Sequence, residues 1–215
     1  MTRITAFDRF QFVLWHSIIS WRHHIKPPHS INFLPEINMP EAKVFESAND
    51  QWSKQTQGGG NTIEVRYGWC AAASALWTLS TLQGTPAASS KPDQNRSGIL
   101  QVKYRWDGSH QSDINLLQGL DLNPEHVLQD KSRDEAINYM ATTPGVYWFG
   151  YTKRLPNGQW EGHAMAADTR TPGQPLFYDI ESGLYRYASV AEFKQGVSSR
   201  YGDASWEVIK VHLTH

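Results

Sequence analysis

The 215-residue chain contains a single cysteine, so it can form neither an intramolecular disulfide nor a zinc site built from several thiolates. Its charge is nearly balanced, with 20 lysine and arginine residues against 21 aspartate and glutamate residues, and neither sign forms a long run. A chain without a clustered basic face is not expected to bind the phosphate backbone of a nucleic acid. We therefore expect no metal, no other cofactor and no nucleic-acid partner.

The sequence also lacks a hydrophobic run long enough to span a bilayer. Its apolar stretch near the start, residues 10–19 (FQFVLWHSII), is short, is interrupted by Gln11 and His16, and is not followed by a small-residue cleavage site. This pattern predicts neither a signal peptide nor an integral membrane segment. Apolar residues recur at helical spacing over 10–21, which favours an amphipathic helix docked on its own domain; a membrane-surface or partner-binding helix stays open.

Aromatic residues, by contrast, are plentiful. Nine tryptophans predict an aromatic core and an aromatic-lined cleft. The length allows one domain with a small appendage. Four prolines punctuate the stretch after the first helix: Pro27, Pro28, Pro35 and Pro40. We predict an N-terminal helix with a proline-rich connector over 1–45 and one globular domain over 46–215.

Periodicity divides this domain into a mainly helical first part and a β-rich last third. We expect a helix over 70–82, a polar loop over 86–98, short helices over 113–120 and 124–128, and a helix that a capping box opens at 132–135 and that ends at 140. Strands follow from 146 onward, with turns at 156–158, 171–173 and 181–183, a helix over 189–197 and a closing strand over 206–213. The fold class is α+β, with the cysteine-bearing helix packed on a C-terminal antiparallel sheet.

The single cysteine, Cys70, lies where a loop turns into a helix of small residues (YGWCAAASALW, residues 67–77). The positive end of a helix dipole favours the thiolate, which is the nucleophilic form of the side chain. A cysteine among alanines can instead be a small buried hydrophobic residue. The position at the helix start favours the nucleophile.

A thiol nucleophile needs a base and a group that orients the base. Among nine histidines we favour His163, because Gly162 precedes it and a small apolar run follows it in a predicted strand. Asp179 ends the next predicted strand, where it either accepts a hydrogen bond from the imidazole or simply starts a turn. Asp168 is the rival, but it lies on the same strand as His163, about 16 Å away at the rise of a strand.

Acyl transfer also needs hydrogen-bond donors for the oxyanion. The backbone N–H of Cys70 is one of them. A side-chain amide should come from just upstream, where Asn61 is the first candidate and Gln55 and Gln57 are weaker ones. Glu64 lies nearer, but an ionised carboxylate would repel an oxyanion. The side-chain donor stays unassigned, with Asn61 as the first choice.

Three islands of sequence, residues 68–77, 162–166 and 176–185, resemble the YopT/AvrPphB group of papain-fold bacterial effector cysteine proteases. In that group a Cys opens a helix, a His lies in a Gly-His-Ala strand, and an Asp lies in a Phe-Phe-Asp-Pro-Asn-x-Gly strand and turn. The resemblance implies Cys70 as nucleophile, His163 as base and Asp179 as the residue that orients the base. Residues 180–182 (IES) depart from the Pro-Asn turn of the group.

The resemblance further implies a papain-like cysteine protease over 46–215, made in a bacterial cytoplasm and secreted without a signal peptide as a toxin or virulence effector. It would cleave a protein inside a target cell. Expected partners are a protein or peptide substrate and either a secretion-system component for delivery or an immunity protein. The same triad leaves open an amidase of peptidoglycan peptides and a glutamine deamidase or transglutaminase. A non-catalytic interaction domain is the remaining alternative.

Overall fold

The computed structural model describes residues 42–46, 69–85, 91–103, 109–158 and 160–214. The chain divides into two units, Met1–Ile37 and Asn38–His215, and all described residues belong to the second. The amphipathic helix expected within 10–21 therefore lies outside the described residues, as does Asn61. Among the residues that are described, no helix is long and apolar enough to cross a membrane.

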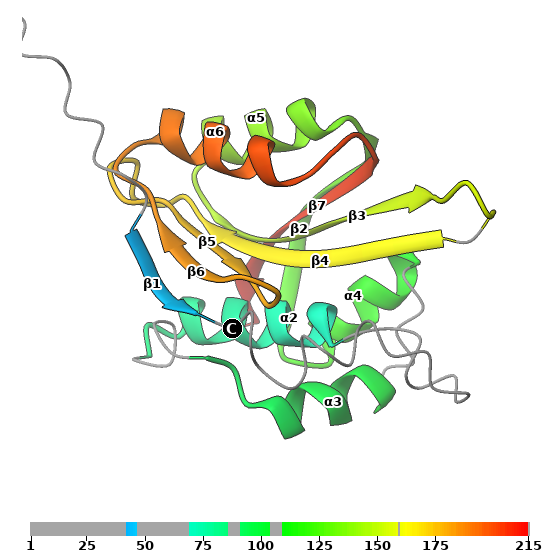
Figure 1. Cartoon of the computed structure of the whole chain (residues 1–215). Coiled ribbons are helices and arrows are strands. Elements are labelled where there is room, and N and C mark those ends of the chain that lie inside the picture. Colours follow the sequence, from blue (N-terminus) through cyan, green and yellow to red (C-terminus); the bar gives the residue numbers. More distant parts are fainter. Residues whose placement is uncertain (1–41, 47–68, 86–90, 104–108, 159, 215) are drawn as a thin grey trace, which may run out of the picture. The chain divides into compact units, whose positions relative to one another are not determined.

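The described part is a seven-stranded antiparallel sheet with helices on both faces (Figure 1). Its strand order is β1-β6-β5-β4-β3-β7-β2, and each neighbouring pair is antiparallel. The strands are β1 (Ala42–Glu46), β2 (Leu122–Lys131), β3 (Val146–Arg154), β4 (Trp160–Asp168), β5 (Leu176–Asp179), β6 (Gly183–Arg186) and β7 (Ser205–Leu213). The helices are α2 (Cys70–Leu82), α3 (Gln94–Lys103), α4 (His110–Gln118), α5 (Arg133–Thr142) and α6 (Val190–Arg200). A mixed fold with an antiparallel sheet is thus confirmed.

Two segments of the first part differ from the prediction. The polar loop expected over 86–98 is wrong from Gln94 onward, where α3 begins. The helix expected over 124–128 is also wrong, because these residues lie in β2 and pair with β7. Proline is unfavourable in the interior of a sheet, yet Pro124 lies in β2. It is tolerated in β2 because this strand is at the edge of the sheet, where the register shifts between Pro124 and His126.

β1 is a second strand, besides β2, that the sequence pattern did not reveal. It pairs with β6, so residues 42–45, which we had placed in the connector, belong to the sheet. The first part of the chain therefore contributes two strands, β1 and β2, that the prediction did not include. Both segments become strands through partners far along the sequence, and such pairing overrides local propensity.

Successive side chains of a strand point to opposite faces of the sheet, so the apolar residues form two cores, one on each face. On β4, Ala164 and Ala166 face the core that contains α2, whereas Met165 and Ala167 face the core that contains α5 and α6. Figure 1 shows the same layering, with α2 on one face of the sheet and α5 and α6 on the other. α3 lies on the side of α2 that is turned away from the sheet.

α2 lies close against the sheet because its first turns consist of small residues. Ala71, Ala72, Ala73 and Ala75 are fully buried. Two hydrogen bonds fix the helix in place. The indole Nε1 of Trp148 donates to the carbonyl of Ala71 at 3.1 Å, and the hydroxyl of Ser74 donates to the carbonyl of Ala164 at 3.1 Å. The start of α2 is thereby held against β3 and β4.

The close passage of β3 along β4 can be tested at Gly150. A Cβ atom at this position would lie 2.7 Å from the carbonyl oxygen of His163. Gly150→Ala should displace β4 at His163 and lower the free energy of unfolding by about 1–3 kcal/mol in urea denaturation. Gly173→Ala is the control, because a Cβ there meets nothing within 4 Å. Equal stabilities of the two variants would contradict the close approach.

Candidate active site

Cys70 is the first residue of α2, as expected from its sequence. Trp69 is the N-cap residue, and the N–H of Ala73 donates to its carbonyl at 2.9 Å. The N–H groups of a first helical turn have no partner within the helix and carry partial positive charge. The thiol therefore lies at the positive end of α2. Only 3% of Cys70 is exposed.

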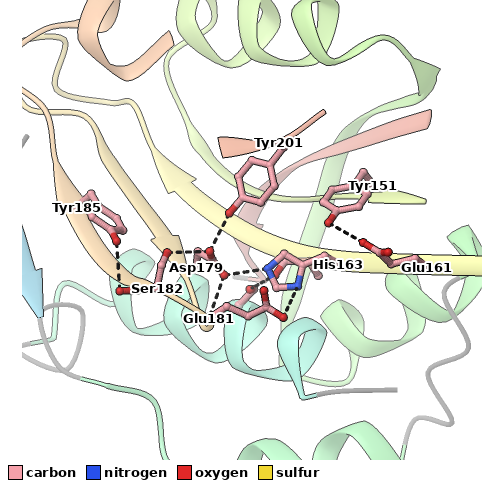
Figure 2. A network of polar contacts seen from close by, with 10 residues as sticks. Tyr151, Glu161, His163, Asp179, Glu181, Ser182, Tyr185 and Tyr201 are labelled. Carbon is pink, nitrogen blue, oxygen red and sulfur yellow. Dashed lines mark hydrogen bonds and ion pairs between the residues drawn. The ribbon is translucent and has the colours of Figure 1, made fainter. Parts of the chain in front are cut away.

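His163 on β4 and Asp179 at the end of β5 form a buried pair. The Nε2 atom of His163 lies 2.8 Å from Oδ1 of Asp179 (Figure 2). The two strands are neighbours, and β5 ends at Asp179 while β4 continues beyond it. The imidazole can therefore meet the carboxylate at the strand end. The residues are 6% and 4% exposed, so water screens this contact little.

The pair shifts both pKa values in the directions that favour charge. Burial by itself lowers the pKa of His163, but the charge of Asp179, the hydrogen bond to it and the contact with Cys70 outweigh burial and hold this pKa well above its usual value. Burial likewise raises the pKa of Asp179, yet His163 and the other hydrogen-bond donors bring it down to about 2. The site therefore favours the protonated form of the imidazole and the ionised form of the carboxylate.

The thiol of Cys70 also acts on the imidazole, and its proximity adds to the raised pKa of His163. Since Nε2 faces Asp179, Nδ1 is the nitrogen left for the thiol. The structure thus brings together the three side chains that the sequence singled out. Asp168 does not join them, because its carboxylate pairs with Arg170 at 2.7 Å.

Asp179 is held by three donors besides His163 (Figure 2). The backbone N–H of Glu181 donates to Oδ1 at 2.9 Å, and the hydroxyls of Ser182 and Tyr201 donate to Oδ2 at 2.8 and 2.7 Å. Each carboxylate oxygen therefore accepts two hydrogen bonds, which fixes its orientation. The Asp-x-Glu-Ser spacing is typical of an aspartate that binds its own turn and could have indicated the first two donors. No local pattern connects Tyr201, which follows α6, with Asp179.

A second carboxylate lies near the imidazole. Oε1 of Glu181 is 3.9 Å from Nδ1 of His163, on the ring nitrogen that Asp179 does not occupy. The side chain of Glu181 is half-exposed, so water screens its charge. The sequence analysis did not identify this residue, although it lies in the turn that departs from the Pro-Asn pattern.

A pocket of about 150 Å³ opens beside His163 between α4 and strands β3, β4 and β7. Glycines and small side chains form part of its lining, namely Gly150, Gly162 and Ala164. Charged residues also line it, among them Glu207, which pairs with His110. Trp148 and Ala164 line the pocket and also form hydrogen bonds with residues of α2. The pocket therefore adjoins the helix that carries Cys70. Its volume suits one side chain of a bound substrate.

Across the described ranges, no three metal-ligating side chains gather in a way that could hold an ion.

The chain matches no family model, and no curated protein matches it significantly. Among solved structures it is similar to the crystal structure of the Pseudomonas avirulence protein AvrPphB, with 16% sequence identity and a TM-score of 0.49. The match covers 67% of this chain and 92% of that chain. A likeness of this size says nothing about chemistry, which has to come from the contacts of the site itself.

The role of Tyr201 can be measured through acid unfolding. Tyr201→Phe removes a donor from Asp179, so the pKa of Asp179 should rise toward its unfolded value and the acid-unfolding midpoint should move to higher pH. At pH 7 we expect a loss of about 1–3 kcal/mol in the free energy of unfolding, because the acceptor is charged and buried. Tyr147→Phe is the control, since this buried tyrosine donates to the carbonyl of Thr143 away from the site. The same shift of the midpoint in both variants would contradict the assignment.

Asp179 should also make stability depend on pH in the acid range. Its pKa of about 2 lies below the value of about 3.9 in unfolded chains, so the ionised carboxylate stabilises the fold above about pH 4 and stops doing so as the pH falls through about 2. Over this range the wild type should lose on the order of 2 kcal/mol more than Asp179→Asn in urea titrations at successive pH values.

A variant of the exposed Asp134, Asp134→Asn, serves as the control for this titration and should follow the wild type. Parallel pH curves of the wild type and Asp179→Asn would refute the stabilising role of the ionised Asp179.

Proposed function

We propose that this chain is a papain-like cysteine hydrolase that cleaves amide bonds by acyl transfer. Cys70 is the nucleophile, His163 the general base and acid, and Asp179 the residue that orients His163. One observation supports this most directly: the only thiol of the chain lies at a helix start in contact with an imidazole whose other nitrogen is bonded to a buried carboxylate. A cysteine that only fills space needs no such partners.

The arrangement supports a two-step reaction. The proton of the thiol passes to His163, and Asp179 stabilises the imidazolium that forms. Sγ of Cys70 attacks the carbonyl carbon, and the carbonyl oxygen becomes an oxyanion. As the C–N bond breaks, the imidazolium protonates the leaving nitrogen, which leaves a thioester and a neutral imidazole. His163 then takes a proton from water, the hydroxide attacks the thioester, and the acid product departs as the thiol recovers its proton.

We further propose that the amide is a peptide bond in a protein of a target cell. The three islands around Cys70, His163 and Asp179 support this through their resemblance to the YopT/AvrPphB group. On the same ground the chain is an effector that is made in a bacterial cytoplasm and acts inside a target cell. The pocket beside His163 supports binding of a substrate side chain next to the reacting carbonyl.

The decisive variants are those of the three side chains. Cys70→Ala and His163→Ala should abolish hydrolysis and keep the fold, whereas Asp179→Ala should weaken hydrolysis strongly and leave residual turnover. His212→Ala is the control, because this half-exposed histidine pairs with Glu125 away from the site. New protein N-termini are mapped by mass spectrometry in a target-cell lysate treated with each protein.

Several outcomes separate the alternatives. The same new termini with Cys70→Ala as with the wild type would end the proposal. Cleavage of peptidoglycan peptides, or ammonia release from glutamine, in place of new termini would keep the triad and change the substrate. Alkylation of Cys70 by iodoacetamide near neutral pH tests access to the thiol, because a sealed structural cysteine does not react. An inert thiol together with no hydrolysis would indicate a non-catalytic interaction domain.

A further inference from the structure

The start of α2 has a buried neighbour that the proposed reaction has not yet used. The N–H of Ala72, in the first turn of α2, donates to Oε1 of Gln101 on α3 at 3.0 Å, and this bond is buried. Gln101 is 5% exposed. Its Nε2 atom is fully buried and has no hydrogen-bond partner among the described residues. A buried amide donor without an acceptor raises the free energy of the folded state. We therefore expect a ligand to supply the acceptor.

The bond from Ala72 determines where the amide nitrogen lies. The free N–H groups of a first helical turn point out of the helix start. Oε1 of Gln101 meets one of them, and Nε2 is attached to the same carbon atom as Oε1, so both lie at the end of α2 that carries Cys70. α3 is on the side of α2 turned away from the sheet (Figure 1). Gln101 and His163 therefore approach the start of α2 from opposite sides.

We infer that Gln101 supplies the side-chain donor of the oxyanion hole. Its Nε2–H and the backbone N–H of Cys70 bind the substrate oxygen that becomes negative when the thiolate attacks. The inference rests on the proposed function, because an oxyanion forms only if Cys70 attacks a carbonyl. The developing charge supplies the acceptor that Nε2 lacks, and it lies at the positive end of α2.

The two atoms of the Gln101 amide can be tested separately. Capping of α2 needs only an acceptor for the N–H of Ala72, and a glutamate of the same shape provides one. Binding of an oxyanion needs the N–H donor, which a glutamate lacks. Gln101→Glu therefore keeps the cap and removes the donor. Gln101→Leu removes both and serves as the second variant. Gln111→Glu makes the same chemical change on the exposed surface of α4 and serves as the control.

Two reactions of the full chain are compared. The first is hydrolysis of a synthetic peptide that spans a cleavage site of the wild type. The second is alkylation of Cys70 by iodoacetamide, which displaces iodide and forms no oxyanion. For Gln101→Glu we expect kcat/KM for hydrolysis to fall by about 10²–10³-fold, while the plateau rate of alkylation at high pH changes by less than about threefold. Gln111→Glu should match the wild type in both reactions.

The outcomes are distinct. Full hydrolysis by Gln101→Glu would overturn the assignment. A parallel fall of hydrolysis and alkylation in both Gln101 variants would overturn it as well, since Gln101 would then serve only to hold the helix start. Wild-type protein that hydrolyses no better than Cys70→Ala would instead overturn the proposed function, and with it any need for the donor.

Discussion

The hydrogen bond between His163 and Asp179 is the contact on which the rest of the site depends. Burial disfavours the charged form of His163, and the carboxylate of Asp179 at 2.8 Å offsets this effect. Removing one member of such a pair leaves an uncompensated buried charge, which costs about 3–5 kcal/mol. Tyr201, Ser182 and the turn at Glu181 in turn hold the carboxylate. The orientation of the imidazole is thus built into the fold.

The thiol and the carboxylate belong to different layers of the fold. Cys70 is part of the core between α2 and the sheet, whereas Tyr201, which binds Asp179, packs against the core on the α5 and α6 side. His163 contacts both Cys70 and Asp179, so its imidazole links the two layers. Small residues along α2 and glycines on β3 and β4 let these layers approach closely. A peptide hydrolase needs this proximity, because the same imidazole must reach both the sulfur and its orienting acid.

Much of the last third of the fold followed from local patterns, and two segments before it did not. The alternating apolar residues after 146 and the turns between them are strong signals, and the capping box at Ser132 and the N-cap residue Ser189 start α5 and α6. β1 and β2, by contrast, are short or contain Pro124, and they become strands only through β6 and β7. Because these pairing partners are far away in sequence, the residues of β1 and β2 do not by themselves indicate strands.

The same division applies to the site. The amino-acid sequence alone determined that there is one thiol, that it opens a helix, and that a glycine-flanked histidine and a strand-end aspartate are the residues to consider with it, because each depends on neighbours along the chain. Only the tertiary structure decided that Tyr201 binds Asp179 and that Gln101 meets the start of α2. These contacts join side chains from separate elements, and their formation depends on how helices pack on the sheet, which no local pattern encodes.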